Sequence, residues 1–272
     1  DIRDELSRII YEEIFPERNV RYKGNKQKYK INQKLDGVLF NSRPEEISIN
    51  VISPLNENTG NIETLKRQSM GLYELLIILE PDDRLLKDLR LYIQTDNYCR
   101  HNSGTMENNN FQRIIRENMD RNNNRKNNIK ERVKQLISNS TMLVDGREQG
   151  RQGRDFSERI KEGIQTLILF AYRNLRMLEG YIYDESKVIE VLNNQTLNFE
   201  TIHAEASSQV RTYLKDRKTT GLRITVKEIV EHFSKIPFGW GEFDTLFILI
   251  CLYRKNKIEF YADSNILENS EI

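Results

Sequence analysis

Cysteine is scarce in this chain, and long apolar runs are missing altogether. Only Cys99 and Cys251 occur among 272 residues, one in a polar segment and one in an apolar segment. A disulfide framework is therefore not expected, and a reducing cytoplasm fits. No run approaches the roughly 18 apolar residues of a membrane span, and the start has no signal-peptide pattern. We expect a cytoplasmic protein without a membrane partner.

An excess of charge of one sign is also missing. The net charge is +1, with 31% charged and 38% hydrophobic residues, which is typical of a globular protein at the polar end of the range. This balance gives no overall attraction to nucleic acid, so any such binding must come from a local patch. The sequence opens at Asp1 within a helical pattern and closes in a polar stretch. We therefore expect an internal fragment of a longer protein.

A phosphate-binding loop is absent. Such a loop ends in Gly-Lys-Ser/Thr, because backbone N–H groups must surround the phosphates and the lysine must reach their outer oxygens. No segment matches this pattern. Asp184 and Glu185 resemble a magnesium-holding carboxylate pair, but without the loop we interpret Asp184 as a helix N-cap. We expect no cofactor in this chain and no binding or hydrolysis of ATP.

Other catalytic and metal-binding patterns are lacking as well. A restriction-type nuclease needs Glu-x-Lys at a strand end to hold a metal, and the one such triplet, 185–187, lies at a predicted helix start. No Gly-x-Ser-x-Gly elbow is present. The histidines are scattered and neither cysteine has a neighbour at ligand spacing, so no zinc site is expected. An enzyme is the least favoured class.

Residues 1–104 have the pattern of a small α+β unit. A helix is predicted at 1–15, and apolar residues alternate at 29–35 and 47–51, which predicts strands. The apolar run 75–79 predicts a buried strand, and a helix follows it. The Asn-rich residues 96–110 predict a linker. The unit therefore combines a small sheet with helices.

Residues 105–221 are predicted to be mainly helical. A long helix spans 111 to about 138, with apolar residues at both ends and an almost wholly polar centre. A helix that is polar all round either bridges packed parts or projects into solvent. A short strand at 141–144 follows, and further helices are predicted from residue 155, at 185–192 and at 199–214.

Residues 222–272 are predicted to form a winged-helix-like unit. Thr225 and Glu228 stand at capping-box spacing and open a helix. The turn at 237–240 ends it, and a second helix and a short strand follow. The second helix is apolar all round at 246–252, which indicates burial rather than contact with a DNA groove. We expect Trp240 to be buried within the turn.

Several stretches resemble one family, in the same order along the chain. The Pro-Phe-Gly-Trp-Gly-Glu-Phe-Asp turn at 237–244, with its apolar helix and Lys-Ile-Glu-Phe, resembles the P-loop ATPases of BREX phage-resistance systems, the BrxC/PglY type. Similar stretches are 29–37 with 47–54, 77–83 leading to 91–95, and the basic helix after Asn110. The resemblance implies a bacterial, ATP- and magnesium-dependent parent protein that acts in phage exclusion beside other BREX proteins.

The long helix carries the candidate binding residues. Its basic side chains outnumber its acidic ones and are spaced by asparagines, so they could follow a phosphate backbone without reading sequence. The candidates for nucleic-acid binding are Arg113, Arg116, Arg121, Arg125, Lys126 and Lys130. The alternative is a solvated helix face with no ligand.

The sequence therefore predicts a non-catalytic region of a BREX-type ATPase. In the favoured hypothesis it contacts other BREX proteins, double-stranded DNA without sequence preference, or both. In the alternative hypothesis it is an architectural connector between the ATPase core and later domains, with no ligand of its own. Salt-dependent retention on duplex DNA separates the two, because only phosphate contacts depend steeply on salt.

Overall fold

The chain folds into two compact units. The structure is a computed structural model that describes residues 1–25, 27–40, 44–102, 109–150, 155–178, 180–193, 203–221, 223–263 and 265–267. The first unit comprises Asp1–Val20 and Lys30–Phe170, and the second comprises Arg21–Tyr29 and Ala171–Ile272. This division differs from the predicted boundaries at 104 and 221. Residues well beyond 104 remain in the first unit because a strand at 141–144 joins its sheet.

The first unit is built on one mixed sheet. Among the described residues, seven strands run in the order β1-β2-β4-β5-β6-β7, with β3 paired to β2. Strands β2, β4 and β5 are parallel, whereas β6 is antiparallel to β5. All six residues of β4 are buried, as in a central strand covered on both faces. The strands are β1 (Asn19–Arg21), β2 (Lys28–Leu35), β3 (Val38–Leu39), β4 (Ile47–Ile52), β5 (Glu74–Ile78), β6 (Thr141–Val144) and β7 (Arg147–Glu148).

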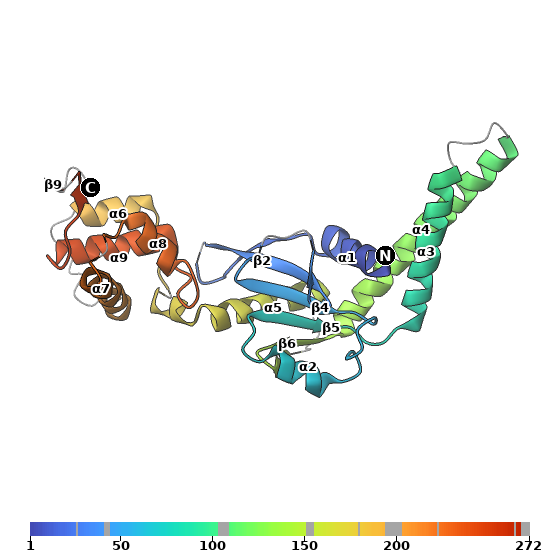
Figure 1. Cartoon of the computed structure of the whole chain (residues 1–272), viewed down its shortest axis with the longest axis horizontal. Helices are drawn as coiled ribbons and strands as arrows, with labels where there is room; N and C mark the ends of the chain where they lie inside the picture. The colour runs from blue at the N-terminus through green and yellow to red at the C-terminus, as the bar shows by residue number, and fades with distance from the viewer. Residues whose placement is uncertain are drawn as a thin grey trace. The chain divides into compact units, whose positions relative to one another are not determined.

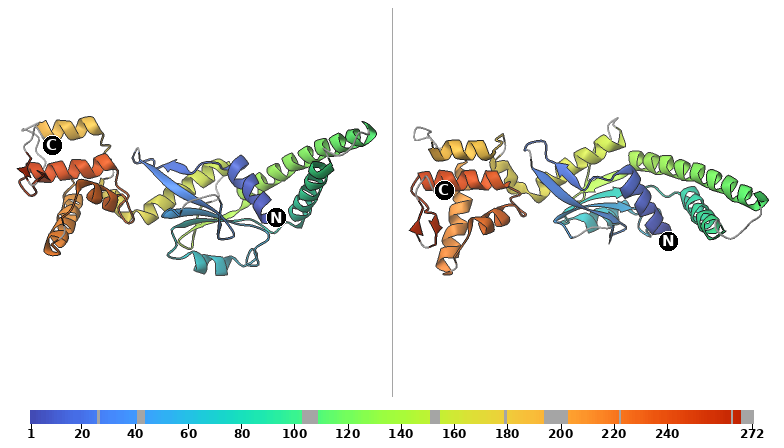
Figure 2. Two further views of the ribbon diagram at one scale, coloured as in Figure 1. Left: turned by 45° about the horizontal axis from the view of Figure 1, so that its top comes forward. Right: turned by 90° about the horizontal axis from the view of Figure 1, so that it is seen from above.

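Helices cover both faces of the sheet (Figure 2). On one face, Leu65 of α2 joins a buried cluster with Leu76 of β5. On the other, α5 approaches so closely that a Cβ on Gly163 would lie 2.8 Å from Leu75 Cδ1. Neighbouring strand residues point to opposite faces, so Leu75 and Leu76 anchor one helix each. The helices of this unit are α1 (Ile2–Arg8), η1 (Ile9–Ile14), α2 (Ile62–Ser69), α3 (Asp83–Asn102), α4 (Asn109–Asn139) and α5 (Phe156–Ala171).

Helices α3 and α4 form a hairpin that projects from the sheet, here called the arm (Figure 1). Its buried seam repeats every seven residues along α4, as in a coiled coil. The seam consists of Leu85, Leu89, Tyr92 and Cys99 from α3, and Ile115, Asn122, Ile129 and Leu136 from α4. The linker predicted at 96–110 is wrong at 96–102, where burial of Cys99 in the seam holds α3 helical, and at 109–110, which begin α4. Residues 103–108 lie outside the described part.

Asn122 is a polar residue inside this seam. It is only 3% exposed, its Nδ2 donates to the carbonyl of Tyr92 at 3.0 Å, and its Oδ1 accepts from Arg125 at 2.7 Å. One buried asparagine can fix the register of two packed helices, because its side chain reaches its hydrogen-bond partner only when the helices are correctly aligned. The polar centre of α4 therefore belongs to a packed hairpin.

Replacement of Asn122 by alanine should destabilise the chain by about 1–2 kcal/mol, from one lost buried hydrogen bond and a small cavity. The matched control is Asn123→Ala, because Asn123 is exposed on the same turn; its effect should stay within about 0.5 kcal/mol. Urea unfolding followed by circular dichroism measures both. Equal effects of the two substitutions would show that the seam does not depend on Asn122.

The second unit contains the predicted winged helix-turn-helix. The Thr225 side chain accepts from the Glu228 backbone and Glu228 accepts from the Thr225 backbone, so the capping box is confirmed. The strand predicted at 258–261 is wrong for 258–260, because the strand observed there is Tyr261–Ala262; it pairs with a following strand to form the wing. The elements are η2 (Arg173–Leu178), α6 (Glu185–Asn193), α7 (Ala204–Thr219), α8 (Val226–Phe233), α9 (Glu242–Arg254), β8 (Tyr261–Ala262) and β9 (Asn265–Ile266). The α+β class predicted for the chain is confirmed.

Candidate nucleic-acid interface

The six candidate residues all lie on α4, but in different surroundings. Arg113, Arg116 and Arg121 are exposed. Arg113 forms an ion pair with Glu117 at 3.9 Å, between side chains that are both largely in solvent. Such exposed pairs hold their partners weakly, so Arg113 can exchange Glu117 for another anion.

Lys126 and Lys130 are brought together by a carboxylate from the start of the chain. Lys126 Nζ lies 2.6 Å from Glu13 Oε1, and Lys130 Nζ lies 3.6 Å from Glu13 Oε2. All three side chains are about two-thirds or more buried. The hydrogen bond to Glu13 raises the pKa of Lys126 above its ordinary value. These two lysines therefore tie α4 to η1, which the sequence did not reveal.

The candidates do not share one face of the helix. At about 100° per residue, Lys126 and Lys130 project on one flank of the buried seam, whereas Arg121 and Arg125 project on the other. Arg125 is half-buried on its flank and donates to Asn122. By the same count Arg116 and Arg121 lie about 140° apart, with Arg113 between them, so a single straight duplex cannot meet all six side chains at once.

The base of the arm is fixed to the sheet by two further arginines. Arg132 Nε lies 2.6 Å from Asp82 Oδ2, and the Asp82 side chain is only 4% exposed. Arg159 of α5 donates to the backbone carbonyls of Ile137 and Ser138, and its Nη2 donates to Ser140 O at 2.7 Å. The last carbonyls of a helix lack partners within it, so Arg159 caps the end of α4.

The winged helix does not offer its second helix to a DNA groove. Residues 247–252 of α9 are all buried, and helices α6, α7 and α8 pack against it. Trp240 is fully buried, as predicted; its ring stacks on Phe233 with centroids 4.7 Å apart, and its Nε1 donates to Asn174 O at 3.2 Å. The α8–α9 turn is therefore a packed core.

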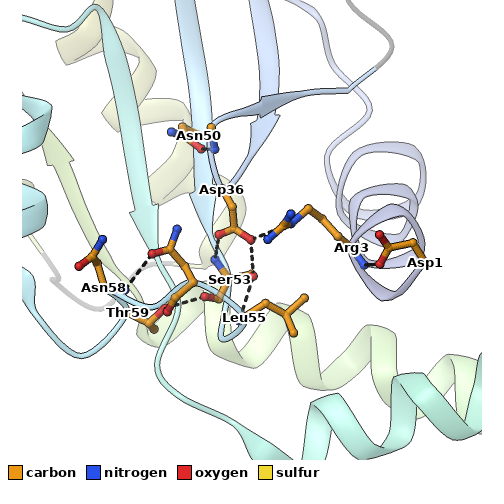
Figure 3. A network of polar contacts seen from close by, with 10 residues as sticks. Asp1, Arg3, Asp36, Asn50, Ser53, Leu55, Asn58 and Thr59 are labelled. Atoms are coloured by element: carbon orange, nitrogen blue, oxygen red, sulfur yellow. Dashed lines mark hydrogen bonds and ion pairs between the residues drawn. The ribbon is translucent and has the colours of Figure 1, made fainter.

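A polar network at the carboxyl ends of the parallel strands was not predicted (Figure 3). Asp36 follows β2 with φ +50°, and it accepts hydrogen bonds from Ser53 N at 2.8 Å and Ser53 Oγ at 2.7 Å. Arg3 Nε lies 3.4 Å from Asp36 Oδ2, and the Asp36 side chain is 3% exposed. This sheet edge binds ligands in many α/β proteins, but here the carboxylate is directed inward and joins α1, β2 and β4.

The carboxylate pair Asp184 and Glu185, which resembled a magnesium site in the sequence, lies at the start of a helix. Asp184 Oδ1 accepts from Lys187 N at 3.1 Å, so it is the N-cap of α6 as interpreted from the sequence. Among the described residues, no group of three or more His, Cys, Asp or Glu side chains is placed to hold a metal ion. In the same part of the chain, no helix combines the length and apolar character needed to cross a membrane.

These features define an α+β domain followed by a winged helix-turn-helix unit. Residues 1–167 match the model of the BREX ATP-binding protein BrxC 4th domain with six-stranded beta sheet, and residues 174–272 match that of the BrxC winged helix-turn-helix domain. The chain belongs to the family of the BREX ATP-binding protein BrxC. The two matches meet near residue 170, where the two compact units also divide. No solved structure matches the chain.

Proposed function

We propose that this part of a BREX ATP-binding protein is a non-catalytic contact region that binds the phosphate backbone of double-stranded DNA without reading its sequence. The observation that carries the proposal is the group of three exposed arginines, Arg113, Arg116 and Arg121, on an arm that projects from the sheet. Guanidinium groups suit phosphates because they present several N–H donors in a fixed plane. In this proposal, ATP and magnesium are bound elsewhere in the protein, and the region works in the cytoplasm beside other BREX proteins.

A specific observation favours the second candidate, an architectural connector without a ligand. Three basic side chains toward the base of α4, those of Lys126, Lys130 and Arg132, are engaged inside the chain, with Glu13 and Asp82 as their partners. In that role the arm is a rigid spacer, and its outward arginines serve solubility alone. The two candidates differ in whether those arginines affect DNA binding.

Replacement of Arg113, Arg116 and Arg121 by glutamine should weaken duplex binding and make it less dependent on salt. Each lost phosphate contact removes about 0.9 from the slope of log affinity against log salt, so the slope should become shallower by about 2 to 3. Fluorescence anisotropy with a labelled mixed-sequence duplex, between about 50 and 200 mM salt, measures the change.

The matched control is Lys126→Gln with Lys130→Gln. These lysines face Glu13, so their replacement should leave the salt slope nearly unchanged and lower the stability of the chain. If the arginine variant and the unaltered chain show the same affinity and the same slope, the connector hypothesis takes the place of the proposal.

A further inference from the structure

The second unit has a basic face that lies apart from α9. Along α7, Arg211, Lys215 and Lys218 follow one another at i, i+4 and i+7, which places them on one side of the helix. All three are exposed. A helix face that packs in a core carries apolar side chains at this spacing. The row of cations therefore lies on the solvent-facing side of α7.

This face is one wall of a groove of about 1130 Å³. The other wall is formed by the end of α9, with Arg254, by the following turn, with Lys257, and by the wing; Arg223 lies between α7 and α8. Six basic side chains therefore line the groove, against one acidic side chain, Glu259. The whole chain carries only +1, so this is a strong local concentration of positive charge.

The wing adds an apolar and aromatic surface to the same groove. Tyr261 and Ile266 are paired across the two wing strands and are 58% and 57% exposed. The Tyr261 hydroxyl donates to Glu259 at 2.6 Å, so the ring is held in place while a large part of it stays in solvent. Exposed apolar surface of this kind, beside a basic track, is suited to a ligand that has both charges and flat rings.

We propose that this groove binds single-stranded nucleic acid, with its phosphates along Arg211, Lys215 and Lys218 and a base stacked on Tyr261. Cations with an exposed aromatic ring are the combination that such strands require, because every base has a flat face and every linkage has a negative charge. The bases of a duplex are already stacked on one another, so a duplex can use the cations but not the ring. An acidic protein segment likewise has no need of the ring.

The test uses the whole chain and a labelled oligothymidine of about 12 nucleotides, a length within the range that one small binding fold covers. Arg211→Gln, Lys215→Gln and Lys218→Gln are combined in one variant, here called the groove variant. Its salt slope should be shallower by about 2, since each phosphate contact with a single strand contributes about 0.7. Tyr261→Ala should weaken binding at least about fivefold, the lower end of the stacking range, and Tyr261→Phe, which keeps the ring but loses the hydrogen bond to Glu259, should have a smaller effect.

Two controls separate this site from the arm. The arm variant, with Arg113, Arg116 and Arg121 replaced by glutamine, should bind the oligothymidine like the unaltered chain, and the groove variant should lose more of its oligothymidine binding than of its duplex binding. These residues are exposed, so thermal unfolding should be unchanged in each variant.

Unchanged oligothymidine binding by the groove variant would overturn the site. Equal binding of duplex and single strand, with no effect of Tyr261→Ala, would overturn the stacked single strand. Equally strong competition by polyglutamate would overturn nucleic acid as the ligand.

Discussion

Replacement of Trp240 by alanine should destabilise the second unit by about 3–5 kcal/mol, the range for large aromatic side chains in cores. The indole is fully buried, it stacks on Phe233, and its N–H is satisfied by the carbonyl of Asn174. Alanine leaves a cavity between α8 and α9 and an unpaired carbonyl. Because Trp240 is the only tryptophan, unfolding must be followed by circular dichroism rather than by fluorescence.

Two controls show which part of the effect comes from the ring. Trp240→Phe keeps an aromatic ring and loses the hydrogen bond, so it should cost less, about 1–2 kcal/mol. Phe243, two residues into α9, is 37% exposed, and Phe243→Ala should cost under about 1 kcal/mol. A loss below about 1 kcal/mol for Trp240→Ala would contradict a packed turn and point to a contact surface there.

Replacement of Arg159 by methionine should destabilise the first unit by about 3 kcal/mol. Methionine keeps the apolar stem but removes the donors to Ile137, Ser138 and Ser140. A hydrogen bond from a charged donor is worth about 1.5–3 kcal/mol, and contributions of bonds from one side chain do not add fully. The carbonyls that lose their partner lie at the buried end of α4, so water cannot replace all of the donors.

The position offers a matched control two residues along α5. Lys161 is exposed, so Lys161→Met should change the stability by less than about 0.5 kcal/mol. Hydrogen exchange locates the effect, because loss of this cap should speed exchange in the last turn of α4. If both methionine variants behave alike, Arg159 does not hold the base of the arm.

The features that the sequence predicted well are local ones. The capping box at Thr225, the all-apolar stretch of α9 and the strand predicted at 47–51 depend on neighbours a few residues apart, and each is found in the structure. The alternation at 47–51 suggested a strand with one exposed face, whereas all six residues of β4 are buried. The wing was also expected, but its strand is short because only two residues pair on each side.

The features that the sequence could not predict depend on partners far apart. Glu13 meets Lys126 and Lys130 across more than a hundred residues, and no local pattern marks either side of that contact. The seven-residue apolar repeat of the arm's seam is interrupted in the sequence, because its central position is Asn122, which is polar. The basic row on α7 is different, because its i, i+4, i+7 spacing is a local signal that the sequence does carry.

The most direct test of a phosphate-contacting region is the salt dependence of duplex binding by the unaltered chain. With two or three arginine contacts along α4, the slope of log affinity against log salt should be about −2 to −3. Two duplexes of unrelated sequence should give the same affinity and the same slope, because backbone contacts carry no sequence information. A slope near zero, or no binding at about 50 mM salt, would contradict DNA contact by this region.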